Sequence, residues 1–123
     1  MKELLGRKAR LTAVACANDL SALGALEVAK QMRYSIPQDL SIIGFDDIDE
    51  AALASPPLST VRLSPRHIGK IAVETLVGRM KGRQDPTRVL VEGTLVIRQS
   101  TAAPPVDLDG PKADSALSGK EAR

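Results

Sequence analysis

Two short apolar runs with a helical segment between them constrain the fold of this chain more than any other feature. The first run is LTAVACA at residues 11–17, and the second is LSIIGF at residues 40–45. Short, mainly apolar runs of this kind are typical of strands buried on both faces of a parallel sheet. The segment between them has apolar residues at helical spacing, namely Leu20, Leu23, Leu26, Ala29 and Met32. We therefore predict a βαβ unit with two parallel strands.

Polar residues follow each run directly. Asn18 and Asp19 come after the first run, where either side chain can cap the first turn of the predicted helix. Asp46 and Asp47 come after the second run. Because ligands bind outside the carboxyl ends of parallel strands, we predict that these four side chains converge in one crevice and bind a ligand. Amide and carboxylate groups held together suit a polyhydroxylated or heterocyclic ligand.

The sequence alone also permits other roles for these four residues. The polar residues after the first run could serve only as helix caps, and the acids after the second could only begin the next loop or helix. A metal or phosphoryl-transfer site would need further acids and a basic group at the same edge. A triad of Ser21, His67 and Asp46 would lack the G-x-S-x-G elbow that positions a nucleophile. A small hydrolase using Asp46 and Asp47 is a third possibility, and we predict no catalytic residue and no enzyme.

The second half of the chain predicts a helix flanked by extended segments. Ser64 and Pro65 are typical of a helix start, because proline at the first helical position gives up no needed hydrogen bond. An apolar stripe follows over about four turns. Its members are Ile68, Ile71, Ala72, Thr75, Leu76 and Met80. SPPLSTVRL before the helix predicts a connector that becomes a strand or a crossing segment, and VLVEGTLVIRQS after it predicts two extended pieces divided near Gly93.

Composition excludes several classes of function. The 123 residues suffice for one modest domain, and a net charge of +2 gives no field that would attract nucleic acid directly. With Cys16 and His67 alone of their types, we expect no disulfide, no metal and no cofactor. The apolar part of MKELLGRKARLTAVACA is short for an export signal, and no run approaches the roughly 20 apolar residues that cross a membrane. The sequence predicts a cytoplasmic protein without membrane contact.

Four motifs together carry a resemblance to a known family. CANDLSALGAL, IPQDLSIIGFDDID, SPPLSTVRLSPRHIGKIAVETL and LVIRQST occur in this order and at the family's spacing. They closely resemble the C-terminal part of the lactose-repressor/galactose-repressor (LacI/GalR) family of bacterial transcription regulators. The resemblance covers roughly residues 1–102 of the chain.

This resemblance implies an α/β fold, specifically an incomplete parallel-sheet lobe of the type I periplasmic-binding-protein-like kind. It implies that Asn18 and Asp46 hydrogen-bond a small-molecule effector such as a sugar or nucleobase-like metabolite. In the family the helix of LSALGAL also packs against a second subunit, so Leu20, Leu23 and Leu26 are candidates for a homodimer interface. The alternative is that this stripe only covers the sheet.

The resemblance also suggests what lies outside the chain. Family members begin with a DNA-binding headpiece, which has no counterpart here, so we expect operator DNA to be bound only through a headpiece absent from this chain. The helix of RHIGKIAVETL packs in another lobe of the family, so alone it would expose an apolar face. We predict a partial effector-binding and dimerisation domain at residues 1–103 and a disordered tail at 104–123. The alternative function is a fragment of a periplasmic sugar-binding protein.

Overall fold

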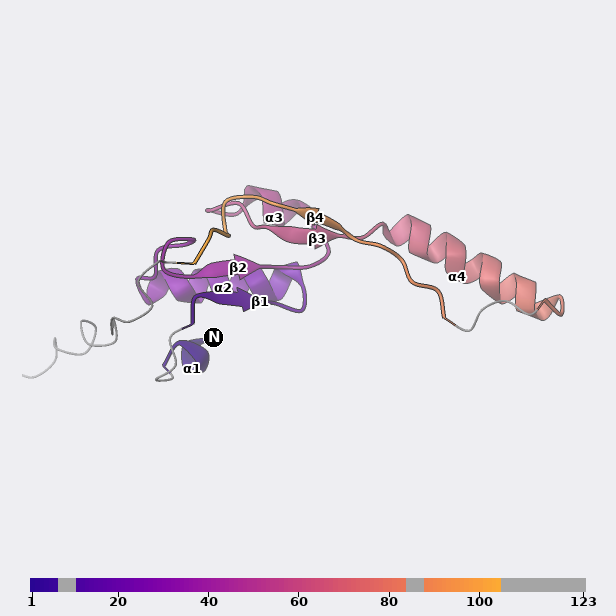
Figure 1. Cartoon of the computed structure of the whole chain (residues 1–123), viewed down its shortest axis with the longest axis horizontal. Coiled ribbons are helices and arrows are strands. Elements are labelled where there is room, and N and C mark those ends of the chain that lie inside the picture. The colour runs from indigo at the N-terminus through magenta and orange to yellow at the C-terminus, as the bar shows by residue number, and fades with distance from the viewer. Residues whose placement is uncertain (7–10, 84–87, 105–123) are drawn as a thin grey trace, which may run out of the picture.

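The computed structural model describes residues 1–6, 11–83 and 88–104, which form a small α/β body and a projecting arm (Figure 1). In chain order the elements are α1 (Lys2–Leu5), β1 (Ala13–Ala15), α2 (Asp19–Gln31), β2 (Ser41–Ile43), α3 (Asp49–Leu53), β3 (Thr60–Arg62), α4 (Pro65–Met80) and β4 (Thr94–Val96).

The predicted βαβ unit is present. β1 and β2 pair in parallel, with Val14 opposite Ile42, and α2 connects them. The Oδ1 atom of Asn18 accepts the Ser21 N–H at 2.8 Å, so the capping role predicted for Asn18 is confirmed. Both strands point towards the side of the body from which the arm leaves (Figure 1), so their carboxyl ends lie on that side.

The expectation of burial on both faces is wrong for β1. Ala13 and Ala15 are exposed, whereas Ser41 and Ile42 of β2 are buried. On its outer side β2 has a further neighbour, because the Ile42 N–H donates to the Ser100 carbonyl oxygen at 2.8 Å. Within the described segments no strand other than β2 pairs with β1, which leaves β1 as an open edge.

The apolar core lies between α2 and the connections around β2. Alanines of α2 allow the helix to approach the strand closely, and larger aliphatic side chains fill the space beneath it. All eight core residues are at most 7% exposed, namely Ala22, Ala25, Leu26, Ala29, Leu40, Ile42, Ala51 and Leu58. Leu40, Ile42 and Leu58 are the largest of the core side chains that are fully buried.

A second, antiparallel pair of strands connects the body to the arm. β3 pairs with β4, with Val61 opposite Leu95. Isolated parallel bridges join the β3 region to the end of β2, between Ile43 and Ser59 and between Asp46 and Arg62. The prediction that STVRL forms a strand is therefore confirmed, and this strand runs directly beside the acidic turn.

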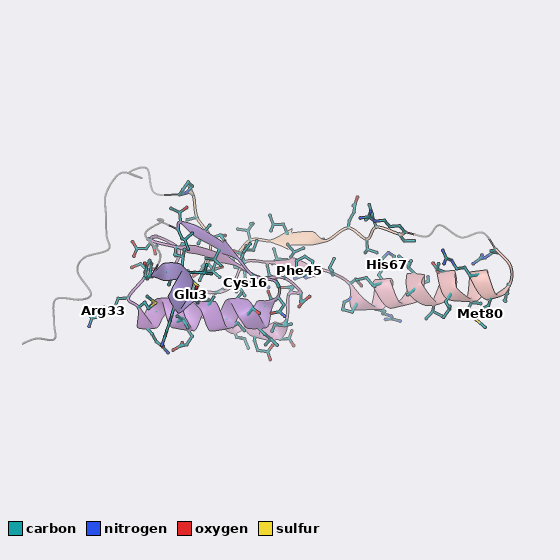
Figure 2. All side chains as sticks on the ribbon, turned by 90° about the horizontal axis from the view of Figure 1, so that it is seen from below. Glu3, Cys16, Arg33, Phe45, His67 and Met80 are labelled. Atoms are coloured by element: carbon teal, nitrogen blue, oxygen red, sulfur yellow. The ribbon has the colours of Figure 1, made fainter. Side chains whose placement is uncertain are left out.

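The arm consists of α4 and the described return segment 88–93 (Figure 1). Ser64 caps α4 as predicted, because its Oγ accepts the His67 N–H at 3.2 Å, and Pro65 is the first helical residue. The apolar stripe of α4 lies outside the core cluster, and Leu76 and Met80 remain 61% and 78% exposed. Figure 2 shows Met80 near the far end of the arm.

The expectation of two extended pieces in VLVEGTLVIRQS is only partly right. β4 is the only strand in this stretch, and residues 88–93 form none, although Val89 and Val91 line an apolar groove against α4. A strand needs a partner for its backbone hydrogen bonds, and this stretch runs beside a helix instead. The predicted tail at 104–123 lies outside the described residues except for the exposed Pro104. None of the helices in the described segments is long and apolar enough to span a membrane.

The separation of core and arm predicts a sharp difference between two identical substitutions. Leu58 is fully buried, whereas Leu76 on α4 is 61% exposed. We expect Leu58→Ala to lower the free energy of unfolding by about 2–5 kcal/mol, because it leaves a cavity in the core. Leu76→Ala should change it by less than about 0.5 kcal/mol. Urea denaturation followed by circular dichroism measures both, and equal losses would contradict the assignment of the core to the body.

Candidate ligand-binding site

The ends of β1 and β2 are joined by backbone hydrogen bonds. The Cys16 N–H donates to the Ile43 carbonyl oxygen at 2.9 Å, and the Asp19 N–H donates to the Phe45 carbonyl oxygen at 2.8 Å. The second bond connects the peptide between residues 18 and 19 to the peptide between residues 45 and 46. The backbones of Asn18 and Asp46 are thereby brought together. Figure 2 shows Phe45 at the end of the body from which the arm leaves.

Asp19 lies beneath this edge and is 1% exposed. Its Oδ1 accepts the hydroxyl of Thr60 at 2.6 Å, and its Oδ2 accepts the Ile48 N–H at 3.0 Å. Both carboxylate oxygens are therefore used within the protein, and each contact lies on a different segment. Asp19 is also the first residue of α2, where the helix dipole favours negative charge. Its ligand-binding role stays a prediction, and its contacts are those of a residue that holds the site together.

Gly44 explains how a carboxylate fits at this position. A Cβ atom on Gly44 would overlap the Asp19 side chain and lie 3.1 Å from the Asp19 Cα. The missing side chain therefore lets the buried carboxylate lie directly against the end of β2. The Gly44 N–H donates to the Ser59 carbonyl oxygen at 2.9 Å, which brings the connection to β3 against the same point.

Asp46 and Asp47 occupy unusual backbone conformations, with φ angles of 114° and 59°. Positive φ is uncommon outside glycine, although Asp tolerates the left-handed region better than most residues. The Asp46 N–H donates to the Val61 carbonyl oxygen at 2.9 Å, and Asp46 as a whole is exposed. Asn18 is half-buried, and its Oδ1 is engaged with Ser21 in the helix cap.

Asp47 lies between two arginines from distant segments. Its Oδ1 accepts Arg98 Nη2 at 2.6 Å, and its Oδ2 accepts Arg62 Nε at 2.5 Å. The hydrogen bond from Arg98 is the main reason why the pKa of Asp47 lies below its ordinary value, with Arg62 adding to this and burial opposing it. The Asp47 side chain is 6% exposed, so this carboxylate is held charged in a largely enclosed position.

An open groove adjoins this ion pair. It has a volume of about 500 Å³ and is lined by Asp47, Ile48, Asp49, Ala52, Leu53, Arg62 and Arg98. Arg62 has 58% of its side chain exposed and Arg98 only 17%, so Arg62 forms the open part of the rim.

The alternative chemistries weighed from the sequence gain no support from the geometry. His67 lies on the arm, well separated from Phe45 at the end of the body (Figure 2), so Ser21, His67 and Asp46 do not form a triad. Burial raises the pKa of the Cys16 thiol, which makes it a poor nucleophile. In the part of the chain that the structure describes, no group of three or more His, Cys, Asp or Glu side chains could hold a metal.

The three leucines predicted for a dimer interface differ in exposure. Leu20 is 69% exposed, Leu23 is half-buried and packs against the core, and Leu26 is 3% exposed within the core. Leu26 therefore has little surface for a partner, and Leu20 has the most. Exposure alone leaves the interface a prediction.

Sequence reasoning missed the residues that hold the acids in place. Thr60, Arg62 and Arg98 were not singled out, although each contacts Asp19 or Asp47. Arg98 is separated from Asp47 by 51 positions and Thr60 from Asp19 by 41. The one available signal was the alternation in β3, which puts Thr60 and Arg62 on the same face of the strand.

The fold and this edge together define one lobe of a periplasmic-binding-protein-like ligand-binding domain. Residues 1–101 match the family model described as periplasmic binding protein-like domain. The chain is 46% identical over 101 residues to the ribose operon repressor of Haemophilus influenzae, covering 81% of this chain and 30% of that protein. It is 42% identical over 103 residues to the transcriptional regulator MalR of Streptomyces coelicolor, covering 83% and 29%.

Solved structures agree with the sequence relatives. The lac repressor dimer bound to operator and the anti-inducer ONPF superposes with a TM-score of 0.76 at 30% identity, covering 82% of this chain and 35% of that one. The transcriptional regulator CelR in complex with cellobiose gives a TM-score of 0.74 at 34% identity, covering 80% and 31%.

This chain belongs to the periplasmic-binding-protein-like domain family, in the form found in LacI-type transcriptional regulators. The predicted family and the predicted α/β fold class are thereby confirmed. The chain spans about 30% of the length of the curated relatives reported above.

The contact between Gly44 and Asp19 predicts that two glycine substitutions have opposite effects. We expect Gly44→Ala to lower the urea midpoint strongly, because the new methyl group would displace the buried carboxylate and separate it from Thr60 and Ile48. Gly24→Ala is the matched control, since a Cβ there meets nothing within 4 Å and alanine favours a helix by about 1 kcal/mol. A Gly44→Ala variant as stable as the Gly24→Ala variant would contradict the close approach.

Proposed function

We propose that this chain is the effector-sensing part of a LacI-type transcriptional regulator and that it performs no catalysis. The observation that carries the proposal is the hydrogen bond between the Asp19 N–H and the Phe45 carbonyl oxygen, which holds Asn18 and Asp46 together at the carboxyl edge of the strands. An amide and a carboxylate at this edge suit a ligand with several hydroxyl groups. Asn18 and Asp46 are the proposed ligand contacts, while Asp19 and Asp47 support them.

The proposed effector is a small sugar or a related metabolite. The relative with 46% identity is named a ribose operon repressor, and one similar solved structure is a cellobiose complex. An effector acts by binding one conformation of the regulator better than the other, and this difference in affinity shifts DNA binding. Operator DNA would be bound through segments outside this chain, and the protein would act in the cytoplasm, as a regulator of transcription must in a bacterium. The curated relatives reported above are regulators by name, which favours this function over a periplasmic sugar-binding protein.

The proposal predicts that a sugar stabilises the intact protein through Asp46. We expect D-ribose or cellobiose, at about 100 times its dissociation constant, to raise the free energy of unfolding by about 2.7 kcal/mol, which differential scanning fluorimetry detects as a higher midpoint. Asp46→Asn should weaken sugar binding on the order of 10- to 100-fold, because a hydrogen bond to a charged acceptor is lost.

Glu50→Gln is the matched control for this experiment. Glu50 is an exposed acid in α3 and does not line the groove, so removing its charge should leave the sugar-induced shift intact. If Asp46→Asn leaves the shift unchanged, Asp46 does not contact the effector. If neither sugar, nor any other in a panel of pentoses, hexoses and disaccharides, stabilises the protein, the proposed sugar-sensing function is wrong.

A homodimer through α2 is the second part of the proposed function. Leu20 is 69% exposed at the start of α2, and one of the similar solved structures is a repressor dimer. An exposed leucine beside the half-buried Leu23 offers apolar surface that a second copy would cover. Leu26 lies beneath this surface and supports it from the core.

The dimer proposal predicts that Leu20→Arg produces monomers. Sedimentation velocity on the intact protein at micromolar concentration should show a dimer for the wild type and a concentration-dependent shift to monomer for the variant, because a charge would be buried at the interface. Leu95→Arg is the control, since Leu95 is also exposed but lies on β4. Equal behaviour of the two variants would place the interface elsewhere.

A further inference from the structure

The acidic turn after β2 contains two consecutive residues in a sparsely populated backbone conformation. Asp46 has a φ angle of 114° and Asp47 one of 59°. Such conformations persist only where surrounding contacts over-determine them, and they are frequent in ligand-binding loops. The surrounding contacts therefore decide where the carboxylate of Asp46 is presented.

The turn is held on both sides of Asp46. At Asp46 itself, the backbone N–H donates to the Val61 carbonyl oxygen of β3 at 2.9 Å. Two residues later, the Ile48 N–H donates to the buried Asp19 carboxylate at 3.0 Å. Between these two points the side chain of Asp47 anchors the turn, because its carboxylate binds Arg62 and Arg98.

Arg98, which binds Asp47, is itself held in place by the body of the protein. Its Nη1 donates to the Leu58 carbonyl oxygen at 2.7 Å, and its backbone N–H donates to the Ser59 hydroxyl at 2.9 Å. The Leu58 side chain is fully buried in the core. Arg98 therefore binds the backbone next to the core through Leu58 and binds the turn through Asp47. These two contacts restrict the movement of the turn relative to the body.

We infer that Asp47 is a positioning residue, which holds the turn through Arg98 and Arg62 so that the neighbouring Asp46 presents its carboxylate to the effector. This inference rests on the proposed function, in which Asp46 contacts the effector. Asp47 itself faces the arginines, so it acts through Asp46 and not by touching the ligand. The competing explanation is that Asp47 only stabilises the contact between the turn and β3 without affecting Asp46.

Hydrogen exchange on the ligand-free, intact protein tests the effect on the turn directly. We expect Asp47→Asn and Arg62→Met to accelerate exchange of the Asp46 N–H by about tenfold or more, while amides of α2 exchange as in the wild type. Arg62→Met is the milder variant, because the Arg62 side chain is 58% exposed and its loss leaves the Arg98 contact in place. Glu50→Gln removes an equal charge from α3, outside the turn and the groove, and should change nothing.

A double-mutant cycle tests whether Asp47 acts through Asp46. Calorimetric titration with whichever of D-ribose and cellobiose binds should give an affinity about tenfold weaker for Asp47→Asn than for the wild type. In an Asp46→Asn background the same substitution should have little further effect, because the carboxylate that Asp47 positions is already gone. A role in general stability would instead lower the unfolding midpoint without this coupling.

The outcomes separate the two proposals. Unchanged exchange of the Asp46 N–H in both variants overturns the positioning role, whatever the effector. Faster exchange with additive effects on sugar affinity also overturns it, because Asp47 would then influence binding independently of Asp46. If exchange is faster in the variants but the wild-type protein binds no sugar, the anchoring of the turn by Asp47 is supported. In that case only the proposed function is refuted.

Discussion

The buried carboxylate of Asp19 is the interaction on which the rest of the body depends. It connects the start of α2 to the acidic turn through Ile48 and to β3 through Thr60. A buried charge is costly unless hydrogen bonds compensate it, so these contacts are conditions for burying Asp19 at all. The space that Gly44 leaves open is a further condition. Helix, turn and crossing strand are therefore fixed relative to one another by one side chain.

A second set of buried polar contacts lies beyond Asp19, where the chain returns from the arm. The Ser100 hydroxyl donates to the Ile42 carbonyl oxygen at 2.6 Å and accepts the Ser59 N–H at 2.8 Å. Ser59 and Ser100 are both fully buried. Strands this short have few backbone hydrogen bonds of their own, so the Ser100 hydroxyl adds to the pairing between β2 and the returning segment, while the Ser59 hydroxyl accepts the Arg98 N–H of that segment.

Features that depend on neighbouring residues could be predicted from the sequence, and features that depend on distant residues could not. The cap by Asn18 and the start of α4 at Ser64 follow from local chemistry and are present. The pairing of Asp47 with Arg98 spans 51 positions, and no periodicity encodes it. The apolar stripe correctly predicted that α4 is a helix. Such a stripe does not indicate which surface packs against it. In the described residues it stays largely open to solvent, which agrees with the exposure that the family resemblance implied.

Asp46 has a side chain at a position where the backbone conformation favours glycine. At a φ angle of 114°, glycine would be the least strained residue, and nothing in the pairing with β3 requires a side chain. An aspartate at this position therefore carries a conformational penalty that must be balanced by its neighbours or by its use. The neighbours supply the hold through Val61, Ile48 and the arginine pair on Asp47. Under the proposed function the exposed carboxylate is balanced by its use, because a hydroxyl-rich effector at the end of two parallel strands has hydrogen-bond donors for it.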